Sequence, residues 1–291
     1  MRCIIGVLVG LKNLSDMDWI QGDEFIKLGK YTFAPQKRRN DDYDKLPNTL
    51  DVRKLRDGDI IYTHTIYVKE LFEVIKDIPQ EVIVVSHNGD VNIDFPPPDN
   101  VIMWYTQNVN ILHDRVEPIP IGLENDRWFK DIHKKEKMLA KLKEPRKYKN
   151  LVYMNFNIAT NPAKREEVYK ALKDKEWVTV DMGSNGHRFD EYLDNIYNHK
   201  FVLCPEGNGI DTHRVWETLY MGSIPVVENN ISAELLYSYF PCLITHNGWT
   251  GLDDISLRWE FNDFNRIKKS TDIHNKMLTF EYWKNKILSH E

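Results

Sequence analysis

The chain has 291 residues, enough for two domains of ordinary size, and a formal net charge of −5. Apolar residues make up 42% of the chain, which excludes general disorder and allows a sizeable core. The mild acidity gives no electrostatic case for binding nucleic acid or anionic membranes. The three cysteines form no Cys-x-x-Cys motif, so we expect neither a disulfide framework nor a zinc module, and a reducing, cytoplasmic location.

The first half alternates short apolar runs with helical or loop segments. The apolar run 3–9 is too short to span a membrane, so we predict a buried strand there and no membrane span. Further strands are predicted at 59–63, 82–85 and 101–105, and a helix at 67–76, where apolar residues recur every three to four positions. Strands that alternate with helices are typical of a parallel α/β sheet.

Polar residues follow the ends of these last three strands. The segments are Thr63-His64-Thr65, Ser86-His87-Asn88-Gly89-Asp90 and Thr106-Gln107-Asn108. Ligands of open parallel sheets bind beyond the carboxyl ends of the strands. We therefore predict that the three segments form one ligand-facing edge, here called the polar rim; ordinary solvated loops are the alternative.

A lysine-rich stretch at 130–149 marks the predicted domain boundary. We expect a first domain at 1–135, a linker at 136–150, a second domain at 151–270 and a C-terminal helix at 271–291. Because the rest of the chain is acidic, the lysines are expected on a solvated helix and linker, with no nucleic acid as partner.

The second half restarts the alternation. Strands are predicted at 151–154, 177–180, 201–204 and 224–227, and helices at 162–174, 188–198 and 212–221. Asn161 and Pro162 have the residue types of a helix cap and first helical position. Gly222 fits the position just past a helix end, and the apolar spacing from Ile273 to Ile287 predicts a C-terminal amphipathic helix.

The segment from Cys204 to Val227 is the most informative part of the sequence. A strand runs into Pro205-Glu206-Gly207-Asn208-Gly209, and a helix follows. Its two glycines allow the backbone to approach a ligand closely. Asp211 or Thr212 can cap the helix, whose free N–H groups favour an anion such as phosphate.

Basic residues occupy the first turns of two predicted helices. Arg214 lies where the helix dipole disfavours a cation unless an anion compensates, and Arg165 repeats this near the helix start at Pro162. Two arginines at two helix starts suit a pyrophosphate. The alternatives are an ion pair between Arg214 and Glu217, three residues apart, and neutralisation of Arg165 by the adjacent glutamates.

A dinucleotide-binding fold fits part of the same segment. Glu228 lies 19 residues after Gly209, near the spacing of the acid that binds a ribose in such folds. However, Thr212 stands at the third glycine position of that fingerprint. Both interpretations place a nucleotide here and differ in the reaction.

The segment also resembles the donor-binding signature of exostosin-type glycosyltransferases (family 47). The shared residues are Phe201, Leu203, Pro205, Gly207, Arg214, Glu217, Leu219, Gly222, Ile224, Pro225 and Val226. Pro120-Ile121-Gly122-Leu123 and the helix start at Arg165 are also similar to the family. The chain looks like a compact soluble member of the kind that large DNA viruses of algae encode, among which xylosyltransferases occur.

The resemblance implies a GT-B fold, in which two Rossmann-like domains face a cleft, here followed by a C-terminal helix. It also implies an inverting transfer of a sugar, xylose first, from a UDP-sugar to a hydroxyl of an oligosaccharide or glycoprotein glycan. The implied donor-binding residues are Arg165, Glu206, Gly207, Asn208, Gly209, Thr212, His213, Arg214 and Glu217. The arginines would stabilise the leaving phosphate, and Glu217 would bind the ribose.

The base that deprotonates the acceptor is expected from the first domain, across the cleft. Asp90 is the first choice, and His87, His64 and Glu124 are the other candidates. We expect no cofactor beyond the UDP-sugar and no essential metal, because the Asp-x-Asp triplets at 16–18, 42–44 and 57–59 do not follow apolar strands. Two other functions stay open: an NAD-dependent oxidoreductase and a non-catalytic glycan- or nucleotide-binding module.

Overall fold

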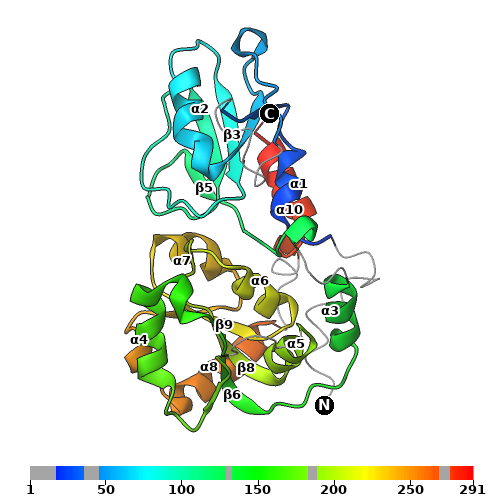
Figure 1. Cartoon of the computed structure of the whole chain (residues 1–291), viewed down its shortest axis with the longest axis vertical. Coiled ribbons are helices and arrows are strands. Elements are labelled where there is room, and N and C mark those ends of the chain that lie inside the picture. The colour runs from blue at the N-terminus through cyan, green and yellow to red at the C-terminus, as the bar shows by residue number, and fades with distance from the viewer. Residues whose placement is uncertain (1–17, 36–45, 129–132, 183–188, 269–275, 291) are drawn as a thin grey trace.

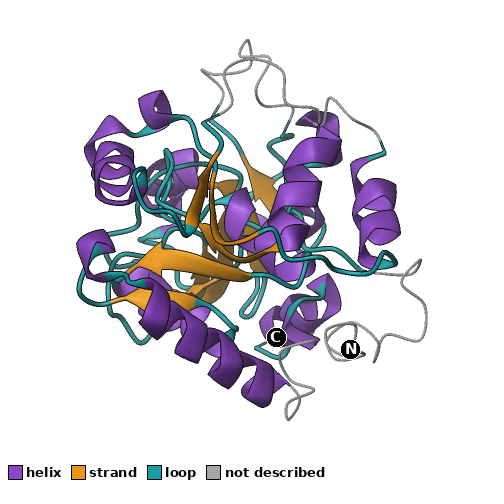
Figure 2. Ribbon diagram, turned by 90° about the horizontal axis from the view of Figure 1, so that it is seen from below, coloured by secondary structure: helices purple, strands orange, loops and turns teal. Residues whose placement is uncertain are grey.

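The computed structural model describes residues 18–35, 46–128, 133–182, 189–268 and 276–290. Within these ranges lie two parallel five-stranded sheets, one in each half of the chain (Figure 1). Seen from below, the strands lie at the centre of the molecule with helices around them (Figure 2). The strand predicted at 3–9 lies outside the described residues.

The first sheet keeps its strands in chain order, β1-β2-β3-β4-β5. The strands are β1 Tyr31–Phe33, β2 Ile60–His64, β3 Val82–His87, β4 Val101–Thr106 and β5 Val116–Pro118. Every residue of β3 is buried, as expected for a β-branched run in a sheet covered on both faces. Helix α2 (Val68–Ile75) buries the apolar face that its sequence spacing predicts.

The second sheet has the order β10-β9-β8-β6-β7. Its strands are β6 Asn150–Met154, β7 Val178–Val180, β8 His199–Leu203, β9 Ile224–Glu228 and β10 Leu243–Thr245. The helices of this half are α3 Lys134–Leu142, α4 Pro162–Leu172, α5 Phe189–Asn198, α6 His213–Tyr220, α7 Ile231–Leu236 and α8 Asp254–Lys268. The strands and helices predicted for 151–227 are confirmed, with ends that differ by one or two residues.

Local signals at helix ends are also confirmed. The Asn161 side chain accepts a hydrogen bond from the backbone N–H of Lys164, and Pro162 opens α4. Gly222, just past α6, has a φ of +71°, the left-handed conformation that glycine adopts at low cost.

The polar rim forms because the strands of the first sheet end together. His64 pairs in register with His87, and Ser86 pairs with Thr106. All four side chains are buried, so other parts of the chain cover the strand ends themselves, whereas Asp90, farther along its segment, is exposed.

Helix α3, in the lysine-rich stretch, packs against α5 (Figure 1). Lys137 pairs with Asp190 at 3.2 Å, and Lys141 pairs with Asp194 at 3.0 Å. The predicted solvated helix is therefore confirmed only in part: two lysines of α3 neutralise carboxylates of the neighbouring helix, whereas Lys143, Lys147 and Lys149 are exposed.

The C-terminal helix α10 (Phe280–Leu288) returns to the first half of the chain and lies beside α1 (Gly22–Ile26) in Figure 1. The Phe280 ring meets the Phe25 ring edge-on, with centroids 5.1 Å apart. Lys286 forms an ion pair with Glu117 at 2.5 Å. The chain thus crosses between the two halves twice.

The predicted α/β architecture is confirmed: each half has a parallel sheet, and the segments beyond both sheets' carboxyl ends face one another, as a GT-B fold requires. No helix among the described residues has the length and apolarity needed to cross a membrane.

Candidate functional site

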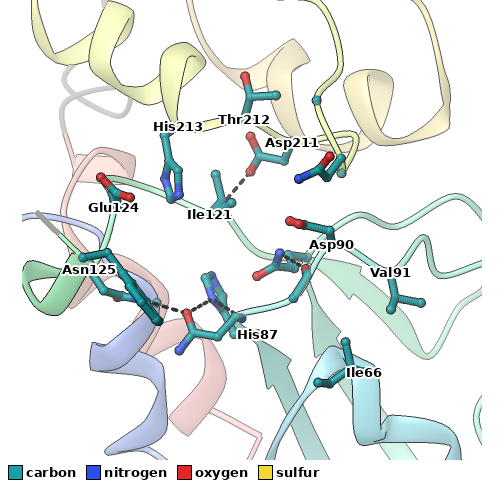
Figure 3. Close-up of a pocket in the computed structure, with 18 of the residues that line it drawn as sticks. Ile66, His87, Asp90, Val91, Ile121, Glu124, Asn125, Asp211, Thr212 and His213 are labelled. Carbon is teal, nitrogen blue, oxygen red and sulfur yellow. Dashed lines mark hydrogen bonds between the residues drawn. The ribbon is translucent and has the colours of Figure 1, made fainter. Parts of the chain in front are cut away.

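A cavity of about 720 Å³ lies between the two halves. The first half contributes the loops after β3, β4 and β5, and the second contributes the start of α4, the loop 207–209 and the start of α6. Figure 3 shows side chains from both halves pointing into this space. The site therefore lies where ligands of open α/β sheets bind, beyond the strand ends.

The start of α6 has unsatisfied hydrogen-bonding groups. Thr212 is the N-cap residue, but its side chain makes no capping bond. Its Oγ1 is buried and has no hydrogen-bond partner, and the same is true of Nε of Arg214. Within the described part of the chain, the Arg214 guanidinium has no hydrogen bond and no ion pair. Buried polar groups normally have partners, and an anion at this helix start would supply one to both groups.

A second guanidinium lies close to the first. Arg165 donates from Nε to the backbone oxygen of Glu206 at 2.9 Å and from Nη1 to that of Asn157 at 2.8 Å. Burial, and then the charge of Arg214, lower the pKa of Arg165 to about 10. Two like charges this close repel each other, and a bound anion would relieve that repulsion.

The glycine loop closes tightly beside Arg165. The N–H of Gly207 donates to the oxygen of Gly209 at 3.0 Å, and the Asn161 side chain donates to the oxygen of Gly207 at 2.8 Å. A Cβ at position 209 would lie 2.7 Å from Nδ2 of Asn108, which is closer than real contacts allow. Glycine is required there because a side chain of the other half approaches the backbone.

Glu217 does not pair with Arg214. Its Oε1 accepts from Nζ of Lys134 at 2.5 Å, and its Oε2 accepts from the hydroxyl of Tyr192 at 2.6 Å. Burial alone would raise the pKa of Glu217, but Lys134 and Tyr192 lower it below its usual value. The ion pair of Arg214 with Glu217, left open by the sequence, is absent, and both Glu217 oxygens already have partners.

We expect Lys134→Ala to lower the free energy of unfolding by about 3–5 kcal/mol, because Glu217 would be left buried without its cation. The depressed pKa of Glu217 means that the pair's stabilisation is present at neutral pH and is lost as the pH falls through that pKa. The difference in the free energy of unfolding between pH 7 and pH 4 should therefore be smaller in the variant than in the wild type. Urea unfolding at pH 7 and pH 4 measures both effects.

The matched control is Lys170→Ala, which removes an exposed pair with Glu166 at 2.7 Å. Exposed pairs contribute about 0–1 kcal/mol, so little change is expected. Equal losses in the two variants would contradict the assigned role of Lys134.

The start of α6 is joined to the loop after β5. The Asp211 carboxylate accepts hydrogen bonds from the Ile121 N–H at 2.7 Å, Nε1 of Trp216 at 2.8 Å and the Tyr237 hydroxyl at 2.6 Å. Nδ1 of His213 donates to the oxygen of Gly122 at 2.8 Å. Because a carbonyl only accepts, Nδ1 carries a proton. The sequence predicted Asp211 only as a possible cap and did not predict this connection between the halves.

Two of the four predicted bases, His64 and His87, have side chains that pack or form hydrogen bonds within the polar rim. His64 is buried, does not line the cavity and lies between the rings of Tyr62 and Tyr67. His87 lines the cavity, but its Nε2 donates to the oxygen of Pro120 at 3.0 Å and its Nδ1 accepts from the Asn88 N–H at 2.7 Å. Both ring nitrogens of His87 are therefore occupied.

The structure predicts that His87 makes stability pH-dependent. Burial lowers the pKa of His87 to about 4. Since the unfolded chain takes up the proton near the ordinary value, the folded state loses stability as the pH falls from about 6.5 to about 4, by up to about 3 kcal/mol. Urea unfolding of the wild type and of His87→Gln across this range should show a shallower dependence in the variant. Parallel curves would contradict a buried, neutral His87.

Asp90 and Glu124 differ from the histidines because both line the cavity with carboxylates that have no partner among the described residues. Asp90 is exposed and follows the buried end of β3; in Figure 3 it points into the space between the halves. Glu124 lies on the side of the cavity where His213 is drawn. Of the four predicted bases, these two have the freedom that proton transfer needs.

The other predicted residues lie in or near the cavity. Asn208 is exposed and lines it, whereas Glu206 lies outside the lining and accepts from Nδ2 of Asn230 at 3.0 Å. Glu228, the acid of the dinucleotide alternative, pairs with Lys164 at 2.7 Å and does not line the cavity.

The described residues contain no group of three or more His, Cys, Asp or Glu side chains that is able to hold a metal ion. Asp57-Gly58-Asp59 forms a turn before β2, where Gly58 has a φ of +81° and Asp59 pairs with Lys30 at 2.6 Å. The triplet at 42–44 and the first two residues of that at 16–18 lie outside the described residues.

Residues 127–235 match the family model of the RXYLT1 C-terminal domain. The matched span runs from the end of the loop after β5 through α7. It contains both arginines and the glycine loop, whereas Asp90 lies outside it. Comparison with curated protein sequences gave no significant match.

Two solved structures are similar to the chain at low identity. The N-terminal domain of Candida albicans trehalose-6-phosphate phosphatase is 14% identical with a TM-score of 0.40, and the alignment covers 82% of this chain and 72% of that one. A DNA-modifying β-glucosyltransferase, solved with and without its substrate uridine diphosphoglucose, is 13% identical with a TM-score of 0.27, with coverage of 82% and 78%.

Proposed function

We propose that the chain is a glycosyltransferase that binds a nucleoside-diphosphate sugar in the cavity between its two halves. The observation that carries the proposal is the pair of buried groups without partners at the start of α6, Thr212 Oγ1 and Arg214 Nε, beside the second guanidinium of Arg165. This set suits a diphosphate, which needs positive charge and several donors at once. The match to the RXYLT1 C-terminal domain, a xylosyltransferase-related model, supports glycosyl transfer over the same segment.

The proposed donor is a UDP-sugar, with xylose as the first candidate, and the proposed acceptor is a hydroxyl of a glycan. Asp90 removes the proton of that hydroxyl, and the oxygen then bonds to the anomeric carbon of the sugar. The bond from this carbon to the leaving phosphate oxygen breaks, and configuration inverts. Arg165, Arg214 and the N–H groups of α6 stabilise the charge that develops on the leaving diphosphate.

The placement of Asp90 supports an inverting reaction. It comes from the first half, and the arginines come from the second, so base and leaving group approach the cavity from opposite sides. His213 and Asn208 line the donor side and are proposed to contact the sugar or the phosphate. No metal is proposed, because two arginines and a helix start supply the positive charge that a divalent ion would otherwise provide.

The test starts with ligand binding followed by calorimetry and thermal shift, using UDP, GDP, ADP, inorganic pyrophosphate, NAD, UDP-xylose and UDP-glucose. A ligand that binds the native state raises the unfolding midpoint by mass action. The proposal expects stabilisation by UDP and a UDP-sugar, and a mass gain of one sugar on a member of a glycan panel. Both the stabilisation and the transfer should persist in EDTA. If EDTA abolished transfer and manganese restored it, the metal-free mechanism would be wrong.

Other outcomes favour the alternatives. Stabilisation by NAD alone would favour an oxidoreductase, although Glu228 is already paired with Lys164. Stabilisation by UDP-sugars with neither hydrolysis nor transfer over the whole panel would favour a binding module. Either result would overturn the proposed transferase activity.

A further inference from the structure

Asn108, in the loop after β4, touches the two halves of the site at once. It is buried and has a φ of +56°, in the left-handed region that few residues other than glycine and asparagine adopt. Its Nδ2 donates to the backbone oxygen of Gly89 at 3.2 Å, and its Oδ1 accepts from the backbone N–H of Asp211 at 2.9 Å. A single amide group therefore bridges the first half and the second.

Both partners of this amide stand next to residues of the proposed mechanism. Gly89 precedes Asp90 in the loop after β3, and Asp211 precedes Thr212 at the start of α6. The close approach of Asn108 also explains why position 209 requires glycine, since a Cβ there would lie 2.7 Å from Nδ2. Asn108 therefore contacts three parts of the site: the loop after β3 that carries Asp90, the glycine loop 207–209 and the start of α6.

The backbone of Asn108 is fixed independently of its side chain. Its oxygen accepts from the N–H of Ile93 at 2.9 Å, and the N–H of Asn110 donates to the oxygen of Ile93 at 2.7 Å. These bonds hold residues 108–110 to the same loop that carries Asp90. Asp211 is likewise held by Ile121, Trp216 and Tyr237, so loss of the Asn108 amide would loosen the connection without releasing either loop completely.

We propose that Asn108 is a positioning residue that sets the separation between the Asp90 carboxylate and the diphosphate site at α6. This proposal rests on the proposed function above. Transfer requires the acceptor oxygen, held at Asp90, to meet the anomeric carbon, held by the diphosphate at Arg214. A displacement of about 1 Å between such groups costs about a hundredfold in rate. The amide fixes this separation because it bonds to Gly89, directly before Asp90, and to Asp211, directly before the N-cap residue Thr212 of α6.

The experiment uses two variants. Asn108→Gly keeps the left-handed backbone and deletes the bridge, whereas Asn108→Asp keeps the acceptor for Asp211 and loses the donor to Gly89. Asn110→Ala is the control, because Asn110 is exposed and its backbone bond does not depend on its side chain. For both Asn108 variants we expect kcat to fall about tenfold to a hundredfold, while the KM for the donor and the Kd for UDP change less than about twofold.

A readout independent of turnover is hydrogen–deuterium exchange. In the wild type, UDP at α6 should slow exchange in the peptide covering residues 87–93, and in Asn108→Gly this distant protection should disappear while protection of 207–213 persists. Unchanged kcat, or unchanged protection of 87–93 in the variant, would overturn the positioning role. An equal loss of kcat and donor affinity would also overturn it, because it would indicate general damage to the site.

Failure of the proposed function gives a different pattern. If the wild type neither binds UDP nor transfers sugar, the transferase proposal fails, and the bridge is tested in the unliganded protein. Asn108→Gly should then exchange faster than the wild type in both 87–93 and 207–213, whereas Asn110→Ala should not. Equal exchange in all three proteins would overturn the bridge itself.

Discussion

Replacing Arg214 with alanine is expected to weaken UDP binding about tenfold to a hundredfold while the unfolding midpoint changes little. Hydrogen bonds to charged groups are each worth about 1.5–3 kcal/mol, which corresponds to that loss of affinity. Stability should be retained because, within the described residues, no hydrogen bond or ion pair depends on Arg214. Its removal also relieves the repulsion between its charge and that of Arg165, which adds to burial in lowering the pKa of Arg165. Calorimetric titration with UDP and thermal unfolding measure the two quantities.

Two further variants sharpen this test. Arg214→Lys keeps the charge but not the planar fork that binds two oxygens, so its affinity should fall between those of the wild type and the alanine variant. Arg258→Ala removes an arginine of α8 whose partner is Asp254, at 3.5 Å, and should leave binding unchanged. A large loss of stability in Arg214→Ala with intact UDP affinity would show that the guanidinium is structural.

Replacing Asp90 with asparagine is expected to lower kcat about a hundredfold to ten-thousandfold, since asparagine fits the same space but cannot take the acceptor proton. The Kd for UDP should stay within about twofold of the wild-type value, because Asp90 lies on the half opposite the arginines. Single-turnover transfer measures the rate, and calorimetric titration with UDP measures the Kd.

The matched control is Asp94→Asn, which changes an exposed carboxylate of the same loop that does not line the cavity. Its kcat should equal that of the wild type. If Asp90→Asn keeps full activity and Glu124→Gln loses it, the base is Glu124, and the proposed role of Asp90 is wrong.

Most of the strands that the sequence predicted correctly have long apolar runs; the three-residue β7 is the exception. β3 and β8 are buried along most of their length, so their composition alone distinguishes them from loops. The strands that it missed, β1, β5 and β10, have three residues each. A three-residue segment has too little pattern for a period to show, and its pairing is decided by the neighbouring strand.

The position at which α10 packs was likewise not predictable from the sequence. Its apolar spacing predicted a helix with one buried face, but spacing does not specify which surface covers that face. The structure places the face on the first half, where Phe280 meets Phe25, although the helix follows the second sheet in the chain. This pairing brings together residues that are more than 250 positions apart, and no local signal encodes it.

The ion pairs of the site were also decided by contacts between segments that are distant in the sequence. From the sequence, Arg214 and Glu217 were near neighbours on one helix, so an ion pair was a reasonable alternative. In the structure Glu217 pairs with Lys134, 83 residues away, at 2.5 Å. That contact, made where both side chains are buried, leaves Arg214 available for a ligand.

For the histidines of the polar rim, tertiary contacts instead occupy side chains that the sequence suggested as available bases. Their position after strand ends predicted bases, yet burial lowers the pKa of His87 and hydrogen bonds occupy both of its ring nitrogens. The sequence by itself determined the main strands, the helix starts and the glycine loop, because these depend on residues that are neighbours in the chain. Only the tertiary structure decided which charged groups are neutralised and which stay available, because burial and pairing depend on side chains that distant segments bring into contact.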